Sequence, residues 1–339
     1  MKCNARHTNL RFLTAGLFMY ILSAGLFSSC SALIDEDLSD CRYGSAVRFV
    51  YPIYDDNGGA ADAFSTSVDC IALYIFDSEG KHVATQTERG QTLRDPQWRM
   101  TLDLEPGTYH VVAWAGLDGG SFRGKTFCAT KEDACVQLNC EGKLSRDNLT
   151  PLWHGAADIV VTKNYDEHIV SLVKDTRRIR IVLQQINGEP LDDADFDFSI
   201  TDDNSHLGHD NLPIPNGMLT YRPYTTGQQG VGGNGEAMDS KGAATVAYAE
   251  FSTSRLVEGN LPRLCIDRTS DGEPVVDIPL LDYLLLRRAE GSELTDQQFF
   301  DRNDVYTLVF FLDDDLSWLK TQIIINGWVI RLNSGIIGG

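Results

Sequence analysis

The sequence has few basic residues, few histidines and no long apolar run beyond its N-terminal segment. Its 339 residues include 29 Lys and Arg against 48 Asp and Glu, which gives a formal net charge of −19 at pH 7. Such a surface repels phosphate backbones and anionic headgroups. After residue 27, no apolar stretch approaches the about 20 residues that a membrane-spanning helix needs. These scarcities argue against nucleic-acid binding, electrostatic attachment to lipid and any later membrane span.

Motifs of catalysis and metal binding are also missing. G-x-S-x-G, H-E-x-x-H and the Walker loop do not occur. Residues 230–235 spell G-x-G-x-x-G, but the residues around them do not read as the strand and helix that a dinucleotide loop requires. His206 and His209 form the only metal-like pair, and the acidic residues 192–197 lack the glycine and glutamate of an EF-hand. We therefore predict no enzyme activity, no catalytic residue, no cofactor and no metal site.

The N-terminus has the pattern of an export signal. Three bases and no acid occur within residues 1–11, and an uncharged apolar stretch covers residues 12–27. At the end of this stretch, Leu26-Phe27-Ser28-Ser29-Cys30 resembles the bacterial lipobox, although Phe27 stands where a small aliphatic residue is usual. We predict that residues 1–29 are removed and that Cys30 is lipidated, with ordinary secretion as the alternative. Removal of the three bases takes the net charge to −22.

The remainder of the chain is rich in strand patterns. Residues 47–51 are β-branched and aromatic, and residues 70–76 are apolar on both faces, as expected of a central strand in a sandwich. A charged break at Lys174-Asp175 precedes a new alternating strand. We therefore predict an all-β protein with a signal peptide at 1–29, a lipid tether at 30–44, and β-sandwich domains at 45–174 and 175–339.

Two segments have hairpin patterns. Residues 98–116 alternate apolar and polar side chains on both sides of Pro106-Gly107, a turn dipeptide. Near the C-terminus, Asn326-Gly327 separates two apolar runs, and Asn-Gly is the strongest two-residue hairpin signal. We predict a hairpin at each position.

Helix patterns after the signal are confined to the second predicted domain, which also contains a glycine-rich segment. Residues 278–289 carry four leucines on one helical stripe, and a second short helix is predicted to begin at Ser292 or Thr295. Residues 227–242 hold six glycines without periodicity, which predicts a loop. The second domain should therefore contain one or two short helices.

Three cysteines lie close together in the first predicted domain. Cys128, Cys135 and Cys140 have neither a C-x-x-C pair nor a nearby histidine, which argues against zinc. An exported protein occupies a compartment where disulfides form. One local bridge within the three and free buried thiols are equally consistent with the spacing.

Several motifs together resemble the fimbrial-anchor lipoproteins of Bacteroidales, the FimB-like family. They are spread in family order over nearly the whole mature chain. They comprise Cys30-Ser31, Asp35-Glu36-Asp37-Leu38-Ser39-Asp40-Cys41, Val47-Arg48-Phe49, Val68-Asp69, Leu73-Tyr74-Ile75-Phe76-Asp77, Leu152-Trp153-His154-Gly155, Asp301-Arg302-Asn303-Asp304-Val305-Tyr306 and Ile325-Asn326-Gly327-Trp328-Val329-Ile330. Jointly these motifs are more specific than any one of them.

The resemblance implies two tandem transthyretin-like β-sandwiches on a lipidated N-terminus. It also implies a structural subunit of a fimbrium, anchored in the outer membrane through diacylglycerol and N-acyl chains on Cys30 and facing the cell surface. Polymerising relatives lose their first strand to an arginine-specific protease, and the absence of arginine between Arg48 and Arg89 suits an anchor that keeps this strand. Partners would be fimbrial subunits joined by strand exchange. Residues 328–339 are either a donor strand or the last strand of their own sandwich.

A different class of function is a surface adhesin that binds glycan or matrix. Trp98, Trp114 and Trp153 could provide a stacking platform for sugar rings. Core packing explains these tryptophans equally well, because the alternation around Trp98 places its side chain inward. Exposed and coplanar indole rings would favour the adhesin.

Overall fold

The computed structural model shows a strand-rich fold within one compact unit, Ser45–Gly339. The residues that it describes are 44–55, 58–231, 244–286, 288, 293–325 and 328–332. The predicted signal peptide, Cys30 and all of the tether except Gly44 lie outside the described residues. The fold can therefore test the predicted sandwiches but not the predicted anchor.

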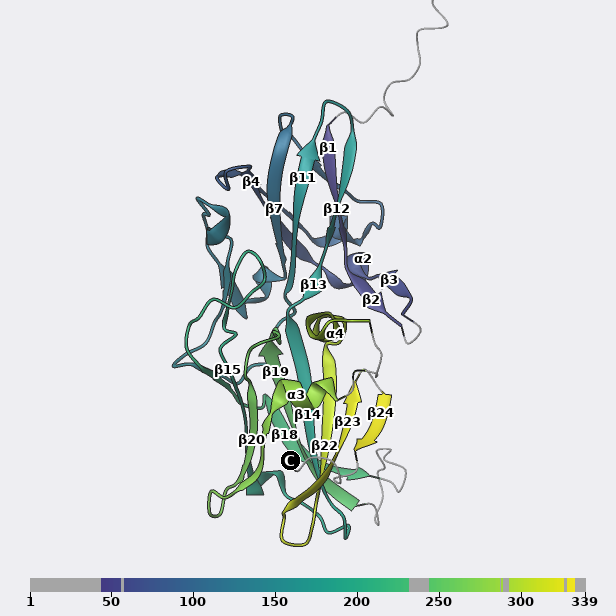
Figure 1. Cartoon of the computed structure of the whole chain (residues 1–339), viewed down its shortest axis with the longest axis vertical. Helices are drawn as coiled ribbons and strands as arrows, with labels where there is room; N and C mark the ends of the chain where they lie inside the picture. The colour runs from purple at the N-terminus through teal and green to yellow at the C-terminus, as the bar shows by residue number, and fades with distance from the viewer. Residues whose placement is uncertain are drawn as a thin grey trace, which may run out of the picture. The chain divides into compact units, whose positions relative to one another are not determined.

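The first half of the fold consists of two facing sheets (Figure 1). One has the order β13-β11-β7-β4-β5, with bounds β4 Cys70–Asp77, β5 His82–Arg89, β7 Gly107–Ala115, β11 Trp153–Val161 and β13 Val173–Lys174. The other has the order β12-β1-β6, with bounds β1 Ser45–Val50, β6 Met100–Leu102 and β12 Asp166–Ser171. Alternate side chains of both sheets meet in one apolar core that includes Val47, Leu73 and Val111. The sandwich predicted for this half is confirmed.

Two small elements extend the first half. A two-stranded ribbon is formed by β2 (Pro52–Tyr54) and β3 (Ala60–Asp62). The short helix α2 (Phe64–Ser67) follows directly and buries Phe64. Our prediction placed helices only in the second half, and α2 corrects it, because a four-residue helix is too short to show a helical stripe.

The hairpin predicted at residues 98–116 is wrong. Strand β6 pairs with β1, whereas β7 pairs with β11 and β4 in the opposite sheet. The turn at Pro106-Gly107 therefore carries the chain from one layer of the sandwich to the other. Met100 and Val111 pack in the same core from opposite sides instead of lying side by side.

The segment after β7 contributes strands that pair with the second half. It contains β8 (Phe122–Gly124), β9 (Val136–Leu138) and β10 (Leu144–Ser145). Strand β9 pairs with β16 (His206–Leu207), and β10 pairs in parallel with β17 (Leu219–Tyr221). The predicted boundary at 174/175 falls between β13 and β14, and these pairings cross it. The division into two domains stays a prediction.

The second half also has two sheets. The larger has the order β18-β19-β14-β22-β23-β24, with bounds β14 Thr176–Gln185, β18 Thr225–Val231, β19 Ala244–Ser254, β22 Val305–Leu312, β23 Trp318–Ile325 and β24 Trp328–Leu332. The smaller has the order β10-β17-β15-β20-β21, with bounds β15 Phe196–Asp202, β20 Arg263–Arg268 and β21 Pro274–Pro279. Ile181, Phe198 and Leu308 belong to the core between them. The predicted all-β class and the second sandwich are confirmed.

Three predictions about local structure have mixed outcomes. The C-terminal hairpin is confirmed, since Ile325 pairs with Trp328 across the Asn-Gly position. The predicted glycine-rich loop is wrong over residues 227–231, which belong to β18, and its remainder to residue 242 lies outside the described residues. The longer predicted helix is shorter than expected, because α3 spans only Leu280–Leu285 and residues 278–279 end β21.

The second predicted helix is confirmed as α4 (Asp296–Arg302). Its N-terminus is fixed by a capping box, in which the Thr295 side chain accepts from the Gln298 backbone N–H and the Gln298 side chain accepts from the Thr295 N–H. Helix α4 places its last turn beside the start of β14 and the end of β13 (Figure 1).

Candidate functional site

The most unusual polar site in the described chain is a set of buried charges around Asp175. This residue is the only one between β13 and β14, and it is 0% exposed. Its backbone N–H donates to Leu152 O at 2.7 Å, and its Oδ1 accepts from Asn211 Nδ2 at 2.9 Å. The carboxylate of Asp175 therefore lies where the first half of the fold continues into the second.

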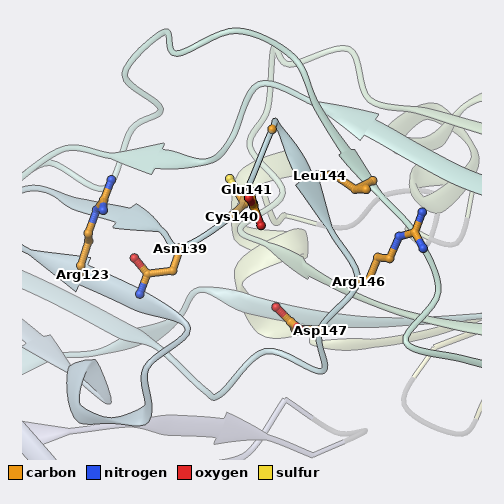
Figure 2. A pocket seen from close by; sticks show the side chains of 8 residues that line it. Arg123, Asn139, Cys140, Glu141, Leu144, Arg146 and Asp147 are labelled. Carbon is orange, nitrogen blue, oxygen red and sulfur yellow. The ribbon is translucent and has the colours of Figure 1, made fainter.

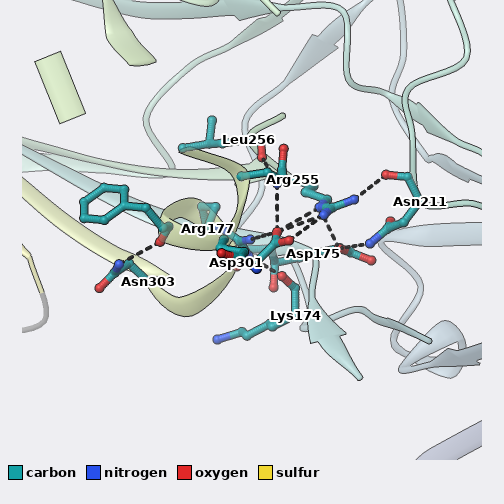
Figure 3. Close-up of polar contacts among 12 residues, drawn as sticks. Lys174, Asp175, Arg177, Asn211, Arg255, Leu256, Asp301 and Asn303 are labelled. Atoms are coloured by element: carbon teal, nitrogen blue, oxygen red, sulfur yellow. Dashed lines mark hydrogen bonds and ion pairs between the residues drawn. The ribbon is translucent and has the colours of Figure 1, made fainter. Parts of the chain in front are cut away.

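Two arginines and a second aspartate complete this junction network, which we define as Asp175, Arg177, Asn211, Arg255 and Asp301 (Figure 3). Arg255, directly after β19, donates from Nη2 to Asp301 Oδ2 at 2.7 Å and from Nε to Asp301 Oδ1 at 3.1 Å. The Arg255 Nε also lies 3.7 Å from Asp175 Oδ1. Arg177 Nη2 lies 3.6 Å from Asp301 Oδ1. Segments far apart in sequence are thereby held at one point.

Burial determines the electrostatics of the network. It raises the pKa of Asp175 to about 7, against the opposing effects of Arg255, Asn211 and Arg177. Among the described atoms, Asp175 Oδ2 and Arg177 Nε have no hydrogen-bond partner. Breaking such a network leaves an uncompensated buried charge, which is far more costly than losing an exposed pair. The arrangement is suited to stabilising a junction, and it presents no nucleophile with a base.

Further contacts support the same junction. Lys174 and Asp304 form an ion pair, and the Arg178 N–H donates to Asp304 O at 2.8 Å. The guanidinium carbon of Arg302 lies 4.1 Å from the centroid of the Tyr54 ring, a cation–π contact between α4 and the β2–β3 ribbon. The two halves of the fold are thus joined by ion pairs, hydrogen bonds and a cation–π contact.

The surroundings of His154 decide whether its imidazole ring can take part in catalysis. His154 is 6% exposed, packs on Trp114 with ring centroids 4.5 Å apart, and donates from Nε2 to His209 O at 2.8 Å. Burial lowers the pKa of His154 to about 4, so the ring is neutral near pH 7. His154 therefore has a packing role. Within the residues that the structure describes, no group of three or more His, Cys, Asp or Glu side chains is placed to hold a metal ion.

The cysteines of the predicted disulfide are separate thiols in the structure. Cys128, Cys135 and Cys140 are all free, with Cys128 and Cys135 buried and Cys140 half-buried. Burial raises the pKa of Cys128 to about 11. The structure has no disulfide bond among these three cysteines. The disulfide stays a prediction.

The tryptophans proposed for sugar stacking do not form a platform. Trp114 and Trp153 are 1% and 5% exposed, and Trp114 Nε1 donates to Ala134 O inside the core. Trp98 is half-buried and stacks on Phe49 and Phe64. The role proposed for Trp114 and Trp153 is therefore wrong, because their rings fill the interior.

One open depression lies along the segment that contains β8, β9 and β10 (Figure 2). Its volume is about 710 Å³, and it is lined by Arg123, Asn139, Cys140, Glu141, Gly142, Leu144, Arg146 and Asp147. No ion pair of the described residues involves Arg146, Glu141 or Asp147. The depression therefore offers both hydrogen-bond donors and acceptors to a ligand.

The remaining predicted sites lie at the chain ends. Cys30 lies outside the described residues, as do residues 333–339 of the predicted donor segment. Residues 328–332 form β24, paired antiparallel with β23 at the edge of the larger sheet. No helix in the described part of the chain is long and apolar enough to cross a membrane.

Sequence patterns missed the junction network. Asp175 was used only as a charged break between strands, and Asp301 only as part of a family motif. The available signal was the Arg177-Arg178 pair at the start of an apolar strand, because a charge inside such a strand needs a partner when it is buried. The sequence does not reveal that the partners are Asp301 and Asp175.

Comparison with known proteins gives consistent matches. The family model described as "Fimbrillin-A associated anchor proteins Mfa1 and Mfa2" matches residues 38–334. The minor fimbrium anchoring subunit Mfa2 of Porphyromonas gingivalis is 23% identical over 339 residues, covering 96% of this chain and 97% of its own.

Two solved structures from Bacteroides thetaiotaomicron are similar over most of the fold. One, described as a candidate adhesin, is 38% identical with a TM-score of 0.75 and covers 88% of this chain and 100% of its own. The other, described as a candidate polysaccharide-binding protein, is 33% identical with a TM-score of 0.72 and covers 87% of this chain and 99% of its own. From the match of the family model across both sandwiches, the chain belongs to the family of fimbrillin-A associated anchor proteins.

Proposed function

We propose that the protein is a non-catalytic, lipid-anchored subunit of a fimbrium that holds the fibre, as its base or as an accessory subunit, at the outer membrane. The observation that carries the proposal is the family match over residues 38–334, which spans both sandwiches. This family is one of fimbrial anchors, and membership implies contact with fimbrial subunits at the cell surface. The junction network supports a mechanical role, because a subunit under tension needs its two halves to remain joined.

Attachment to the membrane is assigned to Cys30. The mature chain has a net charge of −22, so the anionic surface of a membrane would repel it without a covalent lipid. One acyl chain binds only marginally, whereas diacylglycerol with an N-acyl chain holds a protein durably. The acidic run Asp35-Glu36-Asp37 then separates the lipid from the first sandwich.

Joining to other subunits is assigned to exchange of β-strands. An added strand gains main-chain hydrogen bonds along an open sheet edge and specificity from alternate side chains. The edge strand β24 is only five residues long, and residues 333–339 follow it. If residues 328–339 are donated, deleting the residues after Ile330 should abolish association with fimbriae while the protein still folds. Unchanged association of the truncated protein would contradict the donor role.

The lipid anchor can be tested by replacing Cys30 with alanine in cells that assemble the fimbriae. We expect loss of acyl-label incorporation, movement of the protein from the membrane to the soluble fraction, and release of fimbriae into the medium. Cys41→Ala is the matched control, since it removes a nearby thiol outside the predicted lipobox. Fimbriae that remain attached to the Cys30→Ala cells would contradict the proposal that lipid on Cys30 anchors them.

A second candidate function is a surface adhesin that binds glycan. It is favoured by the open depression of about 710 Å³ with its unpaired charged side chains and by the similarity to a candidate polysaccharide-binding protein. Arginine donors and carboxylate acceptors suit the hydroxyl groups of a sugar. Binding of oligosaccharides on a glycan array, lost in Arg146→Gln and kept in the exposed control Arg89→Gln, would support this function. Equal binding by both variants would contradict it.

A further inference from the structure

The outer face of strand β22, in the six-stranded sheet, is more apolar than a solvent-facing surface requires. Strand β22 reads Val-Tyr-Thr-Leu-Val-Phe-Phe-Leu, so every position except Thr307 is apolar. Tyr306, Leu308, Phe310 and Leu312 point inward and are 0% exposed. The alternate positions are therefore on the outward face, where an antiparallel-type sandwich normally carries polar side chains.

Strand β4 shows the structural setting in which a strand that is apolar on both faces normally occurs. It is as apolar as β22, and seven of its eight residues are buried, because one core covers each of its faces. On β22, by contrast, Val305 is 38% exposed, and Val309 and Phe311 are half-buried. A run that is apolar on both faces is typical of a strand covered on both sides. The outer face of β22 has the sequence of a covered surface.

The apolar outer face extends over neighbouring strands. In register, Val309 lies beside Val182 of β14, and Val182 lies beside Tyr248 of β19. On the other side, Thr307 lies beside Ile324 of β23. Figure 1 shows these strands side by side in one sheet. Apolar outward side chains thus occur on all four strands and are interleaved with polar ones, because Gln322 lies beside Val309 and Gln184 beside Phe311.

The charges around the patch are basic, although the chain as a whole carries −19. Arg178 is exposed on the outward face of β14, and Lys320 of β23 lies with Nζ 4.6 Å from the centroid of the Phe311 ring. Glu250 is the only acid at the outward positions of β14, β19, β22 and β23, and it is paired with Arg180 at 2.6 Å. The rim thus complements a partner that carries carboxylates.

The size of this face fits a protein partner. The four strands that carry this face lie about 4.8 Å apart, and eight residues of about 3.3 Å each run along them, so the face spans roughly 20 Å by 25 Å, on the order of 500 Å². A standard protein interface buries about 800 Å² on each partner. A second copy of this chain is disfavoured as the occupant, because two mature chains that each carry a net charge of −22 repel each other.

We propose that the outer face of the sheet, centred on Val309 and Phe311, is the docking surface for a fimbrial subunit whose contact patch is apolar at its centre and acidic at its rim. The inference rests on the proposed function, and it adds a face-to-face contact to the exchange of strands at sheet edges. Apolar burial supplies the affinity, and Arg178 and Lys320 orient the partner.

Photo-crosslinking in intact cells tests the docking surface. The full-length protein carries p-benzoylphenylalanine in place of Thr307, and mass spectrometry identifies what is attached after irradiation. We expect a fimbrial subunit. The control carries the same group in place of Ser199, an outward position of β15 in the other sheet, and should give no such product. A product joined only to residues 333–339 of the same chain, or no product, would overturn the proposal.

A charge reversal at the rim gives an independent readout while the apolar side chains of Val309 and Phe311 themselves are kept. Arg178→Glu with Lys320→Glu should weaken retention of fimbriae by about tenfold, because both side chains would then face carboxylates. Retention equal to that of the unaltered protein would contradict the proposal. In the Cys30→Ala background the Thr307 crosslink should persist in the released complex. The crosslink therefore reports docking, whereas release of fimbriae from the Cys30→Ala cells reports anchoring, so the two failures can be distinguished.

Discussion

Arg255 and Asp301 form a forked ion pair in which two guanidinium nitrogens reach one carboxylate, with distances of 2.7 to 3.1 Å. The pair connects the end of β19 to α4, and Asp175 lies against the same guanidinium. Figure 3 shows these three side chains converging with Arg177. The covalent connection between the two halves is thus reinforced by side chains from three other segments.

Removing one member of this pair should strongly destabilise the fold. Asp301→Ala leaves Arg255 and Arg177 buried without their main counter-charge, and we expect a loss of about 3–5 kcal/mol in the free energy of unfolding. Urea denaturation of the purified protein measures it. The control is Asp271→Ala, which breaks the exposed pair with Arg268 and should cost less than about 1 kcal/mol. Similar losses in the two variants would contradict a special role for the junction.

The buried carboxyl of Asp202 should make stability depend on pH. Burial raises the pKa of Asp202 to about 6, above its unfolded value of 3.8. The native state therefore holds a proton that the unfolded chain has released, and stability falls as the pH rises from about 4 to about 6. Replacing Asp202 with asparagine would keep a side-chain oxygen in the place of Asp202 Oδ1, which accepts a hydrogen bond from Asn260 Nδ2 at 2.9 Å.

Asp202→Asn should remove this part of the pH dependence. The stability of the variant relative to the unaltered protein should increase by on the order of 2 kcal/mol between pH 4 and 6 and then level off. Denaturation curves of both proteins at a series of pH values measure the difference, in which the contributions of other groups cancel. A difference that does not change with pH would show that Asp202 is ionised throughout.

The sequence predicted the local features of this fold better than the contacts between distant segments. The strand nature of β4 follows from a short apolar run, and the C-terminal hairpin from one Asn-Gly dipeptide, all within a few residues. Alternation shows which side chains face a core, but not which strand lies beside them, and this is why residues 98–116 were predicted as a hairpin. Strand β18 was missed because glycine has low strand propensity, whereas pairing with β19 decides the conformation of this segment.

For the candidate functional sites too, the sequence predicted local patterns but not contacts between distant residues. Cys30 and the surrounding residues form a local pattern, so the lipid anchor was predicted from sequence alone. The junction network joins residues that are up to 126 positions apart, from Asp175 to Asp301, and no spacing rule connects them. The apolar outer face of β22 is visible in the sequence only as a run without alternation, and the structure is needed to show that nothing in the described chain buries its second side.

The cysteines of the first half should differ in reactivity. Cys140 is half-buried at the lining of the open depression, whereas Cys128 is 2% exposed and burial raises its pKa to about 11. The thiolate is the reactive form, so native protein treated with iodoacetamide should be labelled first at Cys140. Peptide mapping measures the order. A Cys140 that is labelled only after reduction would show instead that the predicted disulfide includes it.

Two glycines with the same backbone conformation should differ in their tolerance of alanine. Gly116 and Gly120 have φ values of 86° and 84°, so a side chain at either position costs about 1–2 kcal/mol. A Cβ on Gly116 would also lie 2.1 Å from Pro151 O, whereas a Cβ on Gly120 has no atom within 4 Å. We expect Gly116→Ala to lower the melting temperature substantially more than Gly120→Ala. Equal shifts would mean that the strand ends at β7 and β11 move apart without cost.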